Sequence, residues 1–473
     1  MNKLPDINKD FSEWYNEVVF KAELVDHGPV RGTMVIRPYG YEIWENIQKI
    51  LDHRIKECGT KNASFPLLIP ESFLKKEASH VEGFSPELAV VTHAGGKKLD
   101  EPLVVRPTSE TIMHHMFAKW IKSWRDLPLK INQWASVVRW EMRSRPFLRT
   151  TEFLWQEGHT AHATKEDAVA EAEMMMNEFV NFAQQYLAIP VTVGNKSESE
   201  RFAGADRTIT FEAIMPDGKA LQMGTSHLLS QNFAVAFDIK FQNKDGKEEY
   251  VHLTSWCGAT TRLIGATVMM HGDQNGLILP PMIAPIQVVI VPILKADSKE
   301  AVLNAAHKIK DSLTKDGIRV YIDDREEKSP GNKFFEWELK GVPLRIELGP
   351  KDLEKNMAIL VNRLDGHKQD IAIVDIAKAV EKDMIEFQET LFQRAEERLT
   401  RMWHQAAKLA DFGKDMEELG GAYQTGWCQS PVCEQELKKY KAFTRCLLKY
   451  KTFEKCFNCD KDSIVDVVVA KAY

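Results

Sequence analysis

Four arginines and three carboxylates gather between Arg139 and His159. Apolar runs flank a basic loop that Pro146 interrupts, and this pattern predicts two antiparallel strands joined by a hairpin. The alternative, an ordinary charged edge hairpin, would more often carry Thr, Val and Tyr with scattered Lys. Arginine binds phosphate well because its planar fork donates two parallel, charge-assisted hydrogen bonds. Together with Arg262, further along the chain, these arginines would suit a polyphosphate ligand.

Other signatures of phosphate or metal binding are missing from the sequence. It has no P-loop motif, no Gly-x-Gly-x-x-Gly after a predicted strand, and no His-Glu-x-x-His zinc motif. His159 and His162 could form a metal pair, but no third ligand lies near them in the sequence. The chemistry is therefore expected to depend on the arginines and the carboxylates between them.

Hydrophobic periodicity predicts the elements that position these residues. Apolar residues recur at helical spacing over 41–57, and a short strand bounded by prolines follows over 64–70. Residues 106–110 are typical of a helix N-terminus, and Thr164 with Asp167 forms a capping box for a second helix. The strands predicted next cover 208–214, 220–225, 237–241 and 250–255, and a helix covers 258–271. This arrangement places Glu212, Gln222, Thr225 and His227 in one antiparallel sheet.

The second half of the chain changes its pattern after the prolines at 280, 281 and 285. Strands and helices then alternate, which predicts a small parallel or mixed α/β domain. The strands are expected over 287–292, 318–322 and 344–347, with helices over 298–313 and after Pro330. A long charged helix over about 377–410 leads to a cysteine-rich end.

Length and composition limit the class of protein. A chain of 473 residues with 44% hydrophobic content suits two or three globular domains. No apolar run approaches the roughly 20 residues that span a bilayer. Because the first ten residues resemble no signal or transit peptide, we expect a cytoplasmic protein without a membrane partner. The net charge is −6, so any nucleic acid would be bound by local basic patches.

Seven cysteines are distributed unevenly, and five lie near the C-terminus. Two pairs have the spacing of metal ligands: Cys428 and Cys433, then Cys456 and Cys459. The pattern predicts a structural zinc site with four thiolates, for which Cys446 is a spare candidate, while unpaired reduced thiols are the alternative. Basic and aromatic residues alternate between 438 and 455, which suits either an RNA-binding patch or a solvated basic face.

Several segments together resemble the class II aminoacyl-tRNA synthetases. The helix and strand through Pro66 resemble motif 1 of that class, the hairpin from Arg139 to Glu157 resembles motif 2, and the segment from Gly258 to Arg262 resembles motif 3. More specifically, the chain resembles prolyl-tRNA synthetases of the archaeal and eukaryotic type at residues 106–110, 147–150, 153–159, 201–204 and 224–227. The resemblance covers essentially the whole chain. One departure is a motif 3 that is one residue longer, with Cys257 inside it.

The resemblance implies a site for each substrate. Arg139 and Arg262 would be the catalytic residues, with Mg²⁺ bridging the phosphates of ATP. The ATP-binding residues would be Arg139, Glu141, Arg149, Thr150, Phe153, Gln222, Thr225, Thr260 and Arg262. The proline-binding residues would be Thr108, Glu110, Arg139, Trp155, Glu157, His159, Phe202 and His227. The implied reaction joins L-proline to tRNA(Pro) through prolyl-adenylate, with release of pyrophosphate and AMP.

The resemblance also implies the organisation of the chain, which would be an α/β multidomain protein. A class II catalytic domain with an antiparallel sheet would cover 1–282, an α/β anticodon-binding domain 283–400, and a small α/β zinc-binding domain 401–473. Glu326, Lys333 and Arg345 would contact the anticodon. The family's zinc domain ends in a tyrosine that reaches toward the active site, and Tyr473 ends this chain. Motif 1 implies a homodimer.

The same residues bear on editing and on two rival functions. Bacterial-type prolyl enzymes carry a large editing insertion between motifs 2 and 3, whereas the interval from Glu157 to Arg262 is already filled by the predicted helix and strands. A threonine enzyme of the same subclass would need a pocket built for a hydroxyl group. A synthetase-like protein that only binds RNA would be expected to lack Arg139, Glu141 or Arg262, and all three are present.

Overall fold

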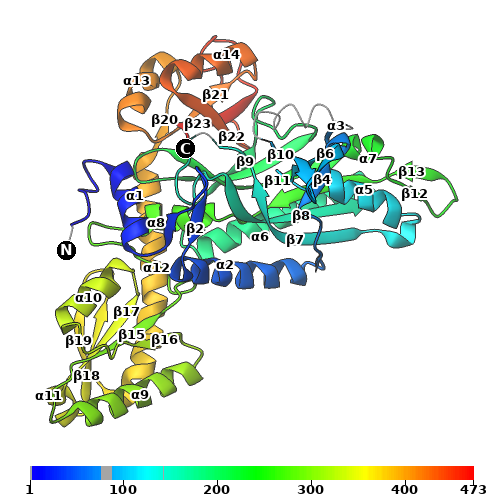
Figure 1. Ribbon diagram of the computed structural model, residues 1–473. Coiled ribbons are helices and arrows are strands. Elements are labelled where there is room, and N and C mark those ends of the chain that lie inside the picture. Colours follow the sequence, from blue (N-terminus) through cyan, green and yellow to red (C-terminus); the bar gives the residue numbers. More distant parts are fainter. Residues whose placement is uncertain (1–2, 76–87, 142) are drawn as a thin grey trace.

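A computed structural model describes residues 3–75, 88–141 and 143–473. Figure 1 shows a large central sheet with helices packed on it, an α/β unit below that sheet, and the C-terminal segment above it. The long helix α12 (Ile376–Met402) runs between the α/β unit and the C-terminal segment. None of the helices in the described ranges is both long and apolar enough to cross a membrane.

The central sheet is antiparallel where it carries the predicted hairpin. Strands β7 (Leu129–Val138) and β8 (Glu152–His162) pair along their full length, from Leu129 opposite Ala161 to Val138 opposite Glu152. Next to β8 lie β14 (His252–Cys257), β11 (Ala220–Ser230), β10 (Arg207–Ile214) and β9 (Thr192–Asn195). Each strand in this series is antiparallel to the next. The predicted antiparallel catalytic sheet is therefore confirmed.

Three helices bury the main apolar core against one face of this sheet. They are α2 (Pro38–Glu57), α6 (Lys165–Gln185) and α8 (Arg262–His271). The Thr164 hydroxyl caps α6 by accepting from the Asp167 amide at 3.1 Å, as the capping box predicts. The helix expected from 258 begins only at Arg262, because the preceding residues pair with β8: the Gln156 amide donates to the Ala259 carbonyl at 2.8 Å. Helix α5 (Glu110–Trp120) likewise begins three residues beyond Pro107.

The α/β unit is a mixed sheet of five strands, as the alternating pattern predicts. Its parallel strands are β16 (Val320–Ile322), β15 (Val288–Pro292) and β17 (Leu344–Leu348), and antiparallel β18 (Met357–Asn362) and β19 (Lys368–Ala372) complete it. Helices α9 (Lys299–Lys315) and α10 (Pro330–Leu339) pack against the sheet. The helix expected to reach 410 ends at Met402, because residues 403–405 form strand β20 (Trp403–Gln405) beside β21 (Ala422–Trp427). Tertiary pairing has overridden local helix propensity there.

The C-terminal segment extends the central sheet and has a small core of its own. Strands β20, β21, β23 (Val465–Lys471) and β22 (Ala442–Leu447) continue the sheet, with Leu447 of β22 opposite Asn195 of β9. Figure 1 shows β22 beside β9 at the top of the sheet. Helices α13 (Leu409–Leu419) and α14 (Pro431–Glu436) pack on this extension. The segment is thus continuous with the strands that carry the central site.

Candidate active site

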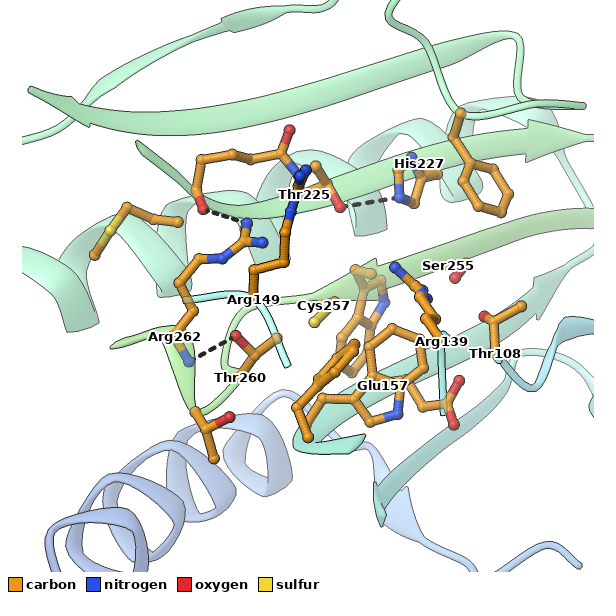
Figure 2. A pocket seen from close by; sticks show the side chains of 18 of the residues that line it. Thr108, Arg139, Arg149, Glu157, Thr225, His227, Ser255, Cys257, Thr260 and Arg262 are labelled. Atoms are coloured by element: carbon orange, nitrogen blue, oxygen red, sulfur yellow. Dashed lines mark hydrogen bonds between the residues drawn. The ribbon is translucent and has the colours of Figure 1, made fainter. Parts of the chain in front are cut away.

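A cavity of about 350 Å³ opens on the central sheet between β8, β11 and β14. All but one of the predicted substrate-binding residues line it. Between residues 108 and 157 these are Thr108, Glu110, Arg139, Glu141, Arg149, Thr150, Phe153, Trp155 and Glu157. Later in the chain they are Phe202, Gln222, Thr225, His227, Thr260 and Arg262. Figure 2 shows Arg149 and Arg262 toward one end of the cavity, Thr108 and Glu157 toward the other, and Arg139 on the side of Thr108.

Arg262, at the first position of α8, lies at the end of the cavity that contains several arginines. Its Nε donates to the Leu148 carbonyl at 3.3 Å, and its Nη1 donates to the Gln222 carbonyl at 3.1 Å. Burial, together with the neighbouring positive charges of Arg139 and Arg149, lowers the pKa of Arg262 to about 10. Three cations that destabilise one another in this way form a site for an anion of high charge.

Arg139 follows the last residue of β7 and is fixed from two sides. Its Nε donates to the Pro107 carbonyl at 3.1 Å, and its guanidinium carbon lies 5.5 Å from the Phe153 ring centre and 5.4 Å from that of Trp155. Phe153 and Trp155 are two residues apart in β8, so their side chains lie on the same face of the strand and both rings face the cavity. Arg139 can therefore present its charge to ligands at both ends of the site.

The opposite end of the cavity contains two buried carboxylates. Glu157 Oε1 accepts from Ser109 Oγ at 2.5 Å and from Gln133 Nε2 at 2.9 Å. Glu110 accepts from Ser255 Oγ at 3.2 Å and from the Thr108 hydroxyl. Both carboxylates are buried and hydrogen-bonded at the wall of the cavity, and buried carboxylates of this kind suit a small cation such as an ammonium group.

An aromatic wall stands beside the carboxylates. The ring centres of Phe202 and His227 are 4.5 Å apart, and His227 is held by Thr208 at Nδ1 and Thr225 at Nε2, each at 2.9 Å. Trp155 forms another wall, and the Arg139 guanidinium lies over its ring. Flat walls next to carboxylates suit a compact, cyclic amine.

His159 is not among the residues that line the cavity, so the structure gives no support to its predicted role as a wall. It lies one step further along the same face of β8 and is completely buried, with Nε2 3.3 Å from Glu157 Oε2. Burial alone would lower the pKa of His159, but the hydrogen bond to Glu157 and the charge of Glu110 raise it. His159 therefore supports Glu157 from behind. His162 bonds instead to Thr160 at 2.7 Å, so the alternative of a histidine metal pair is not supported.

Several residues that line the cavity were not among those predicted from the sequence, including Lys196, Glu200 and Ser255. Ser255 could have been found, since it ends the predicted strand over 250–255, and Cys257, which follows within motif 3, lines the cavity with it. Lys196 and Glu200 follow β9 outside any strand or helix, so no residue periodicity predicts which way their side chains point. The longer motif 3 still places Thr260 in the site, where its Oγ1 accepts from the Arg262 amide at 3.1 Å. Burial and the charge of Glu157 raise the pKa of the Cys257 thiol to about 12, so it stays protonated at neutral pH.

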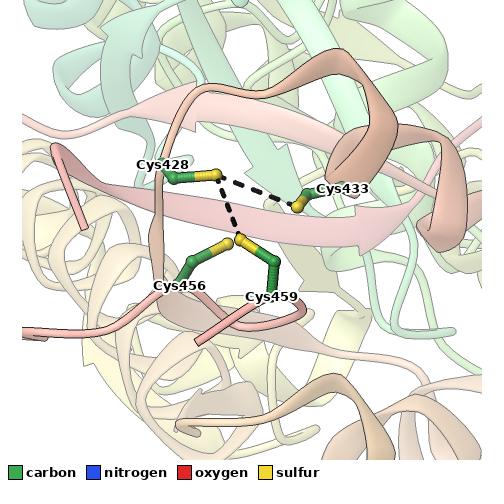
Figure 3. Close-up of side chains that lie close together, drawn as sticks. All are labelled: Cys428, Cys433, Cys456 and Cys459. Atoms are coloured by element: carbon green, nitrogen blue, oxygen red, sulfur yellow. Dashed lines mark hydrogen bonds between the residues drawn. The ribbon is translucent and has the colours of Figure 1, made fainter. Parts of the chain in front are cut away.

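The four cysteines predicted as metal ligands come together near the C-terminus (Figure 3). All four sulfur atoms lie within 4.8 Å of one another, and Cys428 Sγ is 3.8 Å from that of Cys433 and 3.6 Å from that of Cys459. Tetrahedral zinc with bonds of about 2.3 Å needs sulfur separations of about 3.8 Å, so the set fits zinc. Cys446 is excluded from it, because its thiol is buried in β22 against the Thr192 carbonyl.

Zinc content provides a direct check of this cluster. The protein as purified should contain about one zinc ion per chain, since a four-thiolate site is a complete structural ligand set. Cys433→Ser should lose most of this zinc and unfold at a lower temperature, whereas Cys446→Ser should retain it. Metal analysis and thermal unfolding of the two variants give the answer, and equal zinc content in both would contradict the assignment.

The three residues predicted to contact an anticodon are in different environments. Glu326 is exposed and pairs with Lys299 at 2.5 Å. Arg345 lies 4.3 Å from the ring centre of Phe334 and borders a hollow of about 380 Å³. Lys333 is buried, and its ammonium donates to the Asp323 carbonyl at 2.9 Å. The prediction for Lys333 is therefore not supported, because α10 turns this side chain inward as a support for Asp323.

The sheet, the cavity and the arginines define a class II aminoacyl-tRNA synthetase core. The family model described as "tRNA synthetase class II core domain (G, H, P, S and T)" matches residues 92–271, and the "Anticodon binding domain" model matches residues 287–383. Within this class, the chain belongs to the proline–tRNA ligase family, whose members join proline to its tRNA.

Individual relatives support that membership over the full length. The proline–tRNA ligase of Alkaliphilus oremlandii is 50% identical over 100% of this chain and 98% of its own. That of Mycobacterium leprae is also 50% identical, over 98% and 97%. The crystal structure of prolyl-tRNA synthetase from Cryptosporidium parvum, complexed with halofuginone and AMPPNP, has a TM-score of 0.94 at 41% identity and covers 100% of this chain and 99% of its own.

Proposed function

We propose that this chain attaches L-proline to tRNA(Pro) in two steps at the cavity described above. ATP and proline react to give prolyl-adenylate and pyrophosphate, and the prolyl group then passes to the terminal ribose of the tRNA. The observation that carries this proposal is the arrangement of charges. Arg149 and Arg262, whose pKa is lowered, lie at one end, two buried carboxylates lie at the other, and Arg139 lies on the carboxylate side, within reach of ligands at both ends. This polarity matches a triphosphate on one side and an amine on the other.

The arginine end would bind ATP. Arg139 would hold the α-phosphate, while Arg149 and Arg262 would hold the outer phosphates, with Gln222, Thr225 and Thr260 around them. The adenine would stack on Phe153 near Glu141 and Thr150. ATP would bring Mg²⁺, whose charge adds to that of the arginines on the leaving pyrophosphate. Arg139 and Arg262 are fixed before the substrate arrives, and preorganised charge of this kind stabilises a transition state effectively.

The carboxylate end would bind proline. Glu110 and Glu157, together with Thr108, would pair with the secondary ammonium group, and Arg139 would pair with the carboxylate of proline. Phe202, His227 and Trp155 would enclose the ring. Bringing the proline carboxylate and the α-phosphate to the same arginine converts a bimolecular attack into an oriented one, which can supply a large part of the rate enhancement.

The interval between motifs 2 and 3 supports a subtype without an editing insertion. Helix α6 and strands β9 to β14 fill it. Alanine lacks only ring methylenes of proline, and a pocket discriminates such small differences by roughly 10 to 200 fold. The isolated enzyme is therefore expected to form measurable alanyl-tRNA(Pro) in an aminoacylation assay with radiolabelled alanine. An error rate below about one in 10⁴, without added deacylase, would contradict this expectation.

Partners follow from the same proposal. Glu326 and Arg345 would contact the anticodon, since specific RNA recognition uses splayed bases and polar side chains. A homodimer is supported by three exposed apolar residues, Leu67, Leu68 and Val90, on or next to the small sheet that follows motif 1. Zinc would be structural, and the site of action would be the cytoplasm, where tRNA is charged for translation. Sedimentation analysis would test the dimer.

The test of the function is ATP–pyrophosphate exchange with purified protein. Proline should drive exchange without tRNA, because adenylate formation needs only the cavity residues. Transfer to tRNA(Pro) should then be measurable as radiolabelled proline that precipitates with the tRNA in acid. Absence of exchange with proline, in protein that contains zinc and is folded, would contradict the proposal.

A further inference from the structure

The segment of residues 196–202 connects the cavity to the C-terminal zinc region. Lys196, Glu200 and Phe202 line the cavity, and Phe202 packs against His227. The segment consists of turns and irregular backbone between β9 and β10. Its two ends are held by Thr208 of β10, whose carbonyl accepts from the Lys196 amide at 2.8 Å and whose hydroxyl accepts from the Phe202 amide at 3.1 Å, while no strand ladder holds its middle. Side-chain contacts must therefore contribute to the position of Phe202.

One glutamate of the zinc region holds the middle of this segment. Ser197 Oγ donates to Glu434 Oε1 at 2.6 Å, and Ser199 Oγ donates to Glu434 Oε2 at 2.8 Å. The hydroxyl of Thr444, on β22, donates to the same carboxylate. Glu434 follows the zinc-cluster residue Cys433 directly in α14. All three bonds are to the same carboxylate, which therefore ties the segment to both α14 and β22.

A second bridge lies at the beginning of the segment. Glu212 Oε1 accepts from Lys196 Nζ at 2.7 Å, and Glu212 Oε2 accepts from Arg445 Nη2 at 2.7 Å. All three side chains are buried. Arg445 and Thr444 both belong to β22, so both bridges connect this strand to the segment of residues 196–202.

We propose that Glu434 is a positioning residue for the amino-acid pocket, which it holds in shape through Ser197, Ser199 and the backbone leading to Phe202. The proposal rests on the proposed function, in which Phe202 encloses the proline ring. The arginines for ATP lie in the hairpin between β7 and β8 and at the start of α8, outside this segment. Loss of the Glu434 bonds should therefore weaken binding of proline and leave binding of ATP almost unchanged.

Exchange kinetics on the full-length protein test this separation. Glu434→Ala should raise KM for proline about tenfold, the equivalent of one hydrogen bond to a charged group, while KM for ATP changes by less than about twofold. Glu434→Gln should be intermediate, because its amide oxygen still accepts one bond. Glu436→Ala is the matched control: it lies on the same helix, pairs only with Lys439 among the contacts described, and should behave as wild type.

A double substitution on the other side of the contact avoids the zinc cluster altogether. Ser197→Ala with Ser199→Ala should reproduce the higher KM for proline with full zinc content, and combining it with Glu434→Ala should add little more. An unchanged KM for proline in the serine variant would overturn the proposal. Equal losses for proline and ATP in all variants would also overturn it, since that pattern indicates general destabilisation. Wild-type protein without proline-dependent exchange would instead reject the proposed function itself.

Discussion

Arg139→Ala is expected to lower kcat/KM for proline-dependent ATP–pyrophosphate exchange by about 10³-fold or more. Removal of a single preorganised donor from a developing charge costs about 10²–10³-fold in other enzymes, and Arg139 would serve both substrates. Arg139→Lys should not restore the activity, because lysine cannot make the paired, parallel contacts of a guanidinium and cannot keep the same fit against Phe153 and Trp155.

The control for this loss is Arg143→Ala, in the same hairpin. Arg143 is exposed and does not line the cavity, so its removal should change exchange by less than about twofold. Steady-state exchange measured against proline and ATP in turn separates the losses for the two substrates. If Arg139→Ala retained activity within tenfold of wild type, the placement of the α-phosphate would be wrong.

Glu212→Gln is expected to have the largest effect on stability. The substitution leaves the buried cations Lys196 and Arg445 without their anion, and breaking a buried ion pair in this way costs about 3–5 kcal/mol. Thermal unfolding should shift downward by about 5 °C or more. Glu397→Gln, which removes one member of an exposed pair with Arg401, should shift it by less than about 1 °C.

The same residue predicts a dependence on pH. Burial would raise the pKa of Glu212, but Lys196 and Arg445 lower it below the ordinary value of 4.5. A lowered pKa in the folded state means that the ionised carboxylate contributes its stability above about pH 4.5 and loses it as the pH falls through the folded value. The stability difference between wild type and Glu212→Gln should therefore be full at pH 7 and narrow below pH 4.5. A constant difference would contradict the ion-pair account.

The sequence was most informative where periodicity and chemistry coincide. The resemblance to motif 2 implied Phe153, Trp155 and Glu157 together, and their spacing of two residues along β8 places all three on the face that lines the cavity. The cysteine spacing similarly predicted a cluster that the structure brings together. In both cases a local pattern reflects a local geometry.

The depth at which a side chain is buried, and the pairing of strands far apart in the chain, could not be predicted in this way. His159 shares a face with Glu157, and no pattern distinguishes a cavity wall from a residue buried one step behind it. The meeting of β22 with β9 joins segments about 250 residues apart and is decided by tertiary packing, as is the early end of α12 at Met402. The bridge from Glu434 to the cavity wall depends on that meeting and was likewise invisible in the sequence.

The central claim is that the cavity activates proline in preference to other amino acids. ATP–pyrophosphate exchange driven separately by each of the twenty amino acids, with zinc-containing wild-type protein, tests it most directly. We expect proline to give the highest kcat/KM, alanine to follow at a much lower value, and threonine to be inactive, since the pocket is walled by Phe202, His227 and Trp155. Exchange driven best by threonine or by another amino acid, or by none, would contradict the account.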